Sequence, residues 1–294
     1  MFSIHPPSDV GVRLWLTANL QFISVTPKVG APASELIMHN RMGTPLIDSH
    51  CHLDAAVFDG QRDQIVAEAH AAGVTRIVVP AVARGNFDTC EAMRQRYGCL
   101  LAFGLHPLFI EQHLDEHLAE LEARLAHAQP IAVGEIGLDA WRGGDLARQE
   151  ALFIEQLKLA RKYHLPVILH QRQALDRVLK YLRRYPVVGG IAHAFNGSAQ
   201  QAAEFIALGF KLGFGGAMTY SGSTRIRRLA ATLPLSALVL ETDAPDMRPE
   251  WAQDKPNQPA NIARIAKVLA DLRGVSFEMI AQQTVYNTAQ TLCI

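Results

Sequence analysis

Histidine and carboxylate residues stand in this sequence at spacings that suit metal binding. Residues 46–54 read LIDSHCHLD, and in an extended strand His50 and His52 share one face while Cys51 points to the other. Two imidazoles on one face can bind the same cation, although a lone His-x-His pair is more often a buried, hydrogen-bonded pair. The pair becomes informative because four further candidates follow it along the chain: Glu135, His170, His193 and Asp243.

Ligands of this kind without cysteine favour Zn²⁺, Mn²⁺ or Mg²⁺. We expect two divalent ions, because a carboxylate that stands between two groups of ligands in chain order can bridge a pair of ions. The first ion is assigned to His50, His52, Glu135 and Asp243, and the second to Glu135, His170 and His193. Paired ions of this type lie about 3.5–4 Å apart and activate water, whose proton Asp243 is placed to accept. Glu135 and Asp243 are therefore the expected catalytic residues.

The elements that must position these side chains alternate along the chain. Short apolar or β-branched runs are separated by longer amphipathic stretches such as residues 148–163, a pattern typical of repeated βα units. Eight such units match the roughly 250 residues of a closed (β/α)₈ TIM barrel. An open doubly wound sheet is the alternative, but it needs a glycine-rich turn after its first strand, where His50 and His52 stand instead. The expected strands cover residues 46–50, 76–80, 100–106, 131–137, 166–170, 188–193, 210–216 and 237–243.

In this α/β fold class the active site lies at the carboxyl ends of the strands. Glu135, His170, His193 and Asp243 each come where an expected strand gives way to a loop. Each has another interpretation, since the carboxylates could cap helices and the histidines could be buried and hydrogen-bonded. So many coincidences at strand ends favour the metal site.

Composition sets limits on the partners of the chain. Its 294 residues are 49% hydrophobic and 19% charged, as in an ordinary soluble protein, and 28 Lys and Arg balance 28 Asp and Glu. No global positive field exists to hold a long duplex, so contact with nucleic acid must be local. The four cysteines have neither zinc nor disulfide spacing and are expected to be reduced, in a cytoplasmic protein without a membrane anchor.

The first part of the chain does not share the βα rhythm. Residues 1–44 contain scattered prolines and polar residues without periodicity, which predicts a poorly ordered extension. Met42 stands just before the first expected strand, so translation could start there. The domain itself is expected to cover residues 45–294.

Six motifs resemble those of the TatD family of deoxyribonuclease-like enzymes. LIDSHCHLD, FGLHP, VGEIGLD, QLKLARKYHLPVILHQR, AHAFNGS and LETDAPDM occur in the order and spacing of that family, over essentially residues 45–294. ETDAPDM and the later KPNQPANI look most like its YjjV-type branch of metal-dependent hydrolases. The resemblance implies a TIM barrel of the amidohydrolase superfamily, two divalent cations and hydrolysis of nucleic-acid phosphodiesters. It carries the ligand roles onto the residues already assigned: His50, His52, Glu135, His170, His193 and Asp243.

Three further residues are expected to contact the substrate. His106 in GLHP could donate to a phosphate or could merely fix its loop. The guanidinium of Arg172 can donate two parallel hydrogen bonds to phosphate oxygens, which suits a phosphodiester better than a neutral amide. Asn196 follows His193 in a loop that could face the substrate, whereas Ser198 in the same loop is better explained as a helix cap.

The sequence departs from the common family pattern at one place. Many relatives read Arg-Asn-Glu-Pro after the eighth strand, where this chain reads Pro256-Asn257-Gln258-Pro259. The change puts the substrate contacts in doubt and leaves the metal site intact. The expected substrate is DNA, either single-stranded or at its ends, and no obligate protein partner is evident. Two other functions stay open: cleavage of an amide, lactone or aminoacyl ester, and a metal-binding scaffold without catalysis.

Overall fold

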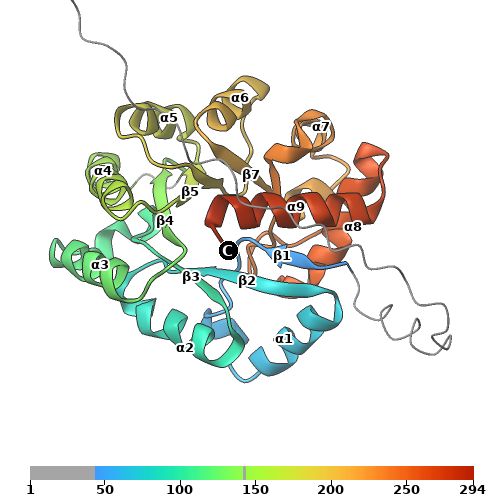
Figure 1. The fold of residues 1–294 in the computed structure, drawn as a ribbon, viewed down its shortest axis with the longest axis horizontal. Coiled ribbons are helices and arrows are strands. Elements are labelled where there is room, and N and C mark those ends of the chain that lie inside the picture. Colours follow the sequence, from blue (N-terminus) through green and yellow to red (C-terminus); the bar gives the residue numbers. More distant parts are fainter. Residues whose placement is uncertain (1–43, 142–143) are drawn as a thin grey trace, which may run out of the picture. The chain divides into compact units, whose positions relative to one another are not determined.

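The structure, a computed structural model, describes residues 44–141 and 144–294. Within those ranges, eight parallel strands pair in chain order into one sheet that curves into a barrel, with helices around its outside (Figure 1). This confirms the (β/α)₈ TIM barrel. The strands are β1 (Leu46–Asp48), β2 (Val74–Pro80), β3 (Leu100–Phe103), β4 (Ala132–Asp139), β5 (Val167–Arg172), β6 (Gly190–Ala192), β7 (Phe210–Phe214) and β8 (Leu238–Leu240).

Helices follow the strands and bury one face each against them. In α4, the side chains of Phe153, Leu157 and Ala160 recur at three- and four-residue spacing and are fully buried. Ser198 caps α6 by accepting a hydrogen bond from the backbone of Gln201, as its position predicts. The α-helices are α1 (Arg62–Ala71), α2 (Phe87–Tyr97), α3 (Glu116–His127), α4 (Leu146–Lys162), α5 (Leu175–Arg184), α6 (Ala199–Ala207), α7 (Thr224–Thr232), α8 (Ile262–Arg273) and α9 (Phe277–Leu292).

The base of the barrel, where the strands begin, is closed by the last helix. Six side chains from alternate strand positions form an apolar interior, and Leu292 of α9 packs against them together with Ile294. Figure 1 shows α9 crossing the axis of the barrel, with the C-terminus at its centre. The interior residues are Val78, Ala102, Ala132, Ile168, Ile191 and Val239.

The barrel closes between its first and last strands through residues at and just beyond their carboxyl ends. The backbone N–H of Ser49 donates to the carbonyl of Leu240 at 3.0 Å, and the N–H of Asp243 donates to the carbonyl of His50 at 2.8 Å. The buried carboxylate of Asp48 accepts hydrogen bonds from the backbone and the hydroxyl of Thr242. This seam therefore places two predicted ligands side by side.

The strands differ from expectation mainly in where they end. β1, β6 and β8 stop before His50, His193 and Asp243, whereas β4 continues to Asp139 and β5 to Arg172. Of the predicted extension, residues 1–43 lie outside the described residues. Helices of the described ranges include none with the length and apolar character needed to cross a membrane. All four cysteines are free thiols.

Candidate metal centre

The carboxylate of Glu135 is the centre of the site. It is buried at the mouth of the barrel, and its Oε2 atom lies 3.1 Å from Nε2 of His50 and 3.6 Å from Nε2 of His52. Its Oε1 atom lies 3.0 Å from Nδ1 of His170 and 3.5 Å from Nε2 of His193. The two oxygens of one carboxylate thus face two separate groups of imidazoles, which is the arrangement that a bridging ligand requires.

Asp243 joins the first of these groups. Its Oδ1 atom lies 3.6 Å from Nε2 of His50 and 3.7 Å from Nε2 of His52, and those two nitrogens are 3.3 Å apart. Asp243 adopts a left-handed backbone conformation with φ of 55°, which aspartate tolerates better than most residues. Its side chain is 15% exposed and that of His52 18%, so water can reach both, whereas His50 and Glu135 are enclosed.

His106 lies inside the cluster, although the sequence predicts a contact with substrate or a role in fixing its loop. Its Nε2 atom is 3.2 Å from Oε1 of Glu135, and its ring packs edge-on against that of His170. Its Nδ1 atom accepts a hydrogen bond from the backbone of Leu108. His106, Glu135 and His170 could together hold an ion, as could His50, Glu135 and His193, or His50, His52 and Asp243.

Two further carboxylates lie beside the outer nitrogens of His170 and His193. Oδ2 of Asp139 lies 2.8 Å from Nε2 of His170, and Oε1 of Glu241 lies 3.4 Å from Nδ1 of His193. Contacts of this kind fix the ring orientation of a metal-binding histidine and raise its basicity. Glu241 is thus placed to orient the ring of His193. Asp139 was missed, because the fourth strand was expected to end at Gly137, although Glu135 and Asp139 alternate onto one face of a longer strand.

Buried amides of α4 fix the backbone near His106 and at Asp139, the end of β4. The side chain of Gln149 accepts from the backbone N–H of Asp139 at 2.9 Å, and that of Gln156 accepts from Leu105 at 2.7 Å. The imidazole of His113 lies 2.9 Å from the carbonyl of His106. These contacts hold His106 and Asp139 in place because each loop backbone has a specific buried partner.

Burial and neighbouring charges both shift the pKa values of the cluster. Burial alone would raise the pKa of Glu135, but the imidazoles of His106 and His50 outweigh it and hold the pKa well below the usual value. Burial would lower the pKa of His193, yet the charges of Glu135 and Asp243 raise it to about 10. Burial raises the pKa of Asp243 to about 6. Imidazole nitrogens and carboxylate oxygens are ligands of divalent metal ions, so this donor set fits them, and protons compete for the same atoms.

The predicted substrate contacts lie at the rim. Arg172 is exposed, and its guanidinium carbon lies 4.9 Å from the ring centre of Trp141. Asn196 is also exposed, and its side-chain oxygen accepts a hydrogen bond from Arg225 at 2.7 Å. Among the described residues, neither is hydrogen-bonded to a predicted metal ligand.

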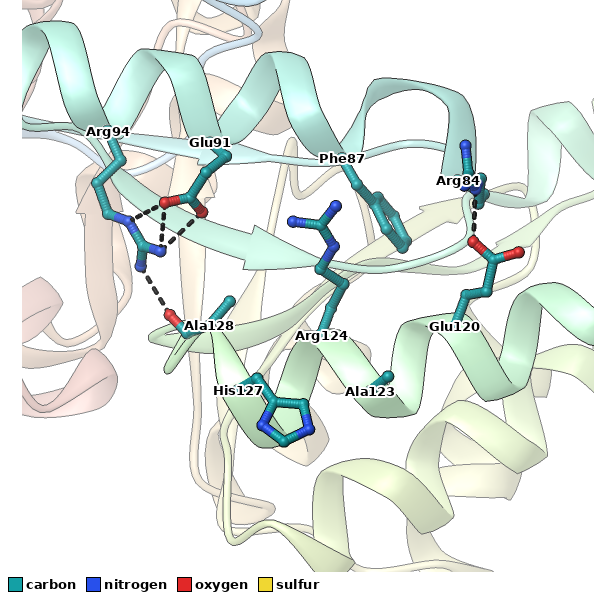
Figure 2. Close-up of a pocket in the computed structure, with 9 residues that line it drawn as sticks. All are labelled: Arg84, Phe87, Glu91, Arg94, Glu120, Ala123, Arg124, His127 and Ala128. Carbon is teal, nitrogen blue, oxygen red and sulfur yellow. Dashed lines mark hydrogen bonds and ion pairs between the residues drawn. The ribbon is translucent and has the colours of Figure 1, made fainter.

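A separate groove lies outside the barrel, between α2 and α3 (Figure 2). Its charged side chains largely neutralise each other: Arg84 pairs with Glu120 at 2.5 Å, and Arg94 with Glu91 at 2.6 Å. No predicted site residue lines it. The groove is thus distinct from the metal centre.

The chain is similar to known proteins in both sequence and structure. The sequence profile described as TatD related DNase matches residues 47–292. The chain is 44% identical over 248 residues to the uncharacterized metal-dependent hydrolase YjjV of Escherichia coli K12, covering 82% of this chain and 95% of that protein. It is 34% identical over 254 residues to the 3'-5' ssDNA/RNA exonuclease TatD of Cronobacter sakazakii, covering 83% and 97%. A crystal structure of the Escherichia coli YjjV protein matches with a TM-score of 0.81 and 42% identity, over 85% of this chain and 98% of that one.

Proposed function

Because the chain belongs to the family of TatD-related DNases, we propose that it is a metal-dependent hydrolase that shortens single-stranded DNA from one end. The observation that carries the proposal is Glu135, whose two oxygens face separate groups of imidazoles. A carboxylate in this position can be shared between two cations. Two-cation sites are suited to phosphodiesters, because negative charge develops on both the attacking and the leaving oxygens.

The ligands divide around Glu135. His50, His52 and Asp243 would hold one cation together with Oε2 of Glu135, and His170 and His193 would hold the other with Oε1. When bound, the two cations supply Lewis-acid chemistry that lowers the pKa of a water molecule and balances charge on the phosphodiester. Zn²⁺, Mn²⁺ and Mg²⁺ all accept histidine or carboxylate ligands, and we propose one of them.

Asp243 is the proposed base. It lies beside His50 on the seam, and its partial exposure lets it meet both water and substrate. A carboxylate within hydrogen-bond reach of the attacking water can take its proton. Asp139 and Glu241 keep the rings of His170 and His193 aimed at the centre throughout the reaction.

The rim residues are the proposed phosphate contacts. Arg172 presents a planar fork of donors that fits two phosphate oxygens, and Asn196 with its partner Arg225 offers further donors beside His193. The net charge of the whole chain is zero, which predicts weak binding to duplex DNA and favours single strands or frayed ends. One relative is itself named as an exonuclease of single-stranded DNA and RNA. We place the reaction in the cytoplasm and require no protein partner for it.

The test is a metal-supplemented assay on end-labelled single-stranded DNA. We expect stepwise shortening that is abolished by EDTA and by Asp243→Asn, whereas Arg172→Ala loses activity but keeps its metals. A parallel panel of amide, lactone and aminoacyl-ester substrates is the control. Higher kcat/KM on those substrates, with DNA left intact by every metal, would replace the nuclease with a carboxyl hydrolase. Bound metal without turnover of any substrate would leave only a scaffold.

A further inference from the structure

The rim of the metal centre carries an aromatic side chain that the proposed chemistry does not use. Trp141 follows β4 by two residues and is 54% exposed, although tryptophan is normally well buried in folded proteins. We propose that Trp141 and Arg172 form a stacking platform for the base of the 3'-terminal nucleotide, while the phosphate of that nucleotide lies at the metal centre. The inference rests on the proposed function.

Hydrogen bonds connect the platform to the metal centre. The backbone N–H of Trp141 donates to Oδ1 of Asp139 at 2.9 Å, and the other oxygen of Asp139 lies 2.8 Å from His170. His170 in turn lies 3.0 Å from Glu135. Trp141 is therefore held beside the ligands by a short and continuous chain of contacts.

The neighbouring strand brings Arg172 to the same place. Asp139 pairs with Arg172 in the register of β4 and β5, and the N–H of Ala140 donates to the carbonyl of Arg172 at 2.9 Å. The guanidinium lies over the indole ring, 4.9 Å from its centre, within cation–π range. Both partners of the pair are thus positioned by backbone contacts.

This arrangement leaves a surface for a planar ligand. A guanidinium covers one face of an indole, and the large exposed fraction of Trp141 leaves ring surface open to solvent. Bases of single strands stack on aromatic rings, and arginine strengthens such stacks, whatever the sequence. A base inside a duplex is already stacked on both sides, so the platform favours unpaired ends.

Two of the most exposed apolar side chains lie away from the mouth of the barrel. Tyr286 is 60% exposed, but it lies on α9, the helix that closes the base of the barrel. Val188 precedes β6, at the end of the strand opposite the mouth. Of the described aromatic residues, only Trp141 combines exposure of half its surface with backbone contact to a residue that orients a predicted ligand.

The test compares two DNA substrates that differ only in the terminal base. On ordinary single-stranded DNA, Trp141→Ala should raise KM about tenfold with little change in kcat, because stacking acts mainly on binding. On DNA whose 3'-terminal nucleotide is abasic, the wild-type protein and Trp141→Ala should have equal KM. Trp141→Tyr should retain the wild-type KM. Trp141→Leu, which fills space without an aromatic ring, should raise KM as much as Trp141→Ala does.

Tyr286→Ala is the matched control and should change neither constant. A second measurement, the anisotropy of a labelled oligonucleotide with EDTA-treated protein, should show the same loss of binding for Trp141→Ala and Trp141→Leu. Equal KM for the wild type and both variants on ordinary DNA would overturn the platform, as would an undiminished effect on abasic DNA. A wild-type protein that neither cleaves nor binds DNA would instead overturn the proposed function and the platform with it.

Discussion

The two ends of the barrel come from the same eight strands but have opposite chemistry. At the base, apolar side chains such as Ile168 and Val239 meet Leu292 of α9, and all three are buried. At the mouth, the equally buried Glu135 is surrounded by imidazoles. Burial of apolar groups stabilises the fold, whereas burial of charges has a desolvation cost. The comparison teaches that apolar burial at the base stabilises the barrel. This stabilisation offsets the desolvation cost of the charged side chains buried at the mouth.

The largest effect is expected at the mouth. Glu135→Gln keeps the shape of the side chain but removes the shared charge, so the protein should lose metal at both positions and activity should fall about a thousandfold or more. The Tm of the metal-free protein should change by only a few degrees. Elemental analysis, an activity assay and calorimetry check these results. Full metal occupancy in the variant would contradict the bridging role.

The next effect is expected at the base, on stability alone. Leu292→Ala removes a buried side chain from the interior cluster and should cost about 2–5 kcal/mol in the free energy of unfolding. Activity at low temperature should be unchanged. Met279→Ala, on an exposed position of the same helix, is the matched control and should leave both quantities unaltered. If Leu292→Ala reduced kcat/KM as strongly as stability, the two ends would not be independent.

A smaller loss is expected from the carboxylate behind His170. Asp139→Asn keeps the size of the side chain but weakens its hold on the imidazole, which should reduce metal affinity or activity about 10–100-fold. Asp145→Asn, at the exposed N-cap of α4, is the control, since asparagine caps a helix equally well. Metal titration followed by kinetics distinguishes the two variants. An unchanged metal affinity and activity in Asp139→Asn would show that His170 needs no orienting partner.

A charge at the rim should have a modest effect that depends on salt. Arg225→Ala should lower kcat/KM on single-stranded DNA several-fold at low ionic strength. The slope of log kcat/KM against the logarithm of the salt concentration should become shallower by about one. At high salt the variant and the wild type should converge. Arg183→Ala, an exposed position on α5, should follow the wild type throughout. A loss for Arg225→Ala that did not depend on salt would contradict a phosphate contact.

The smallest effect is expected from the N-terminal extension. A chain that starts at Met42 should keep its activity and nearly all of its Tm, because residues 1–41 lack the periodic apolar pattern of a packed element. Thermal unfolding of the full and the shortened chain makes the comparison. A large loss of stability on shortening would show that the extension contributes to the barrel.

The sequence was sufficient for the fold and for the candidate ligands. Apolar runs and amphipathic stretches repeat clearly enough to give all eight strands in order, and the six predicted ligands lie together in the structure. The ends of the strands were harder to predict, since an apolar run does not mark the residue at which strand pairing stops. For that reason Asp139 was overlooked. His106 was expected to contact the substrate or to fix its loop, and its place beside Glu135 was not predicted. The role of Leu292 could not be predicted either, because its partners come from distant strands.

The seam between β1 and β8 has a consequence for how the protein is made. Asp48 bonds to Thr242, 194 residues further along the chain, and the ligand segments on either side of the seam meet there. During synthesis, His50 and His52 leave the ribosome long before Asp243 exists. The nascent chain therefore has two of the four ligands of its first cation site until Glu135 is made, and it lacks the last one until Asp243 is made. Contacts of such long sequence separation form late. We expect metal to bind after release from the ribosome, as one of the last steps in maturation.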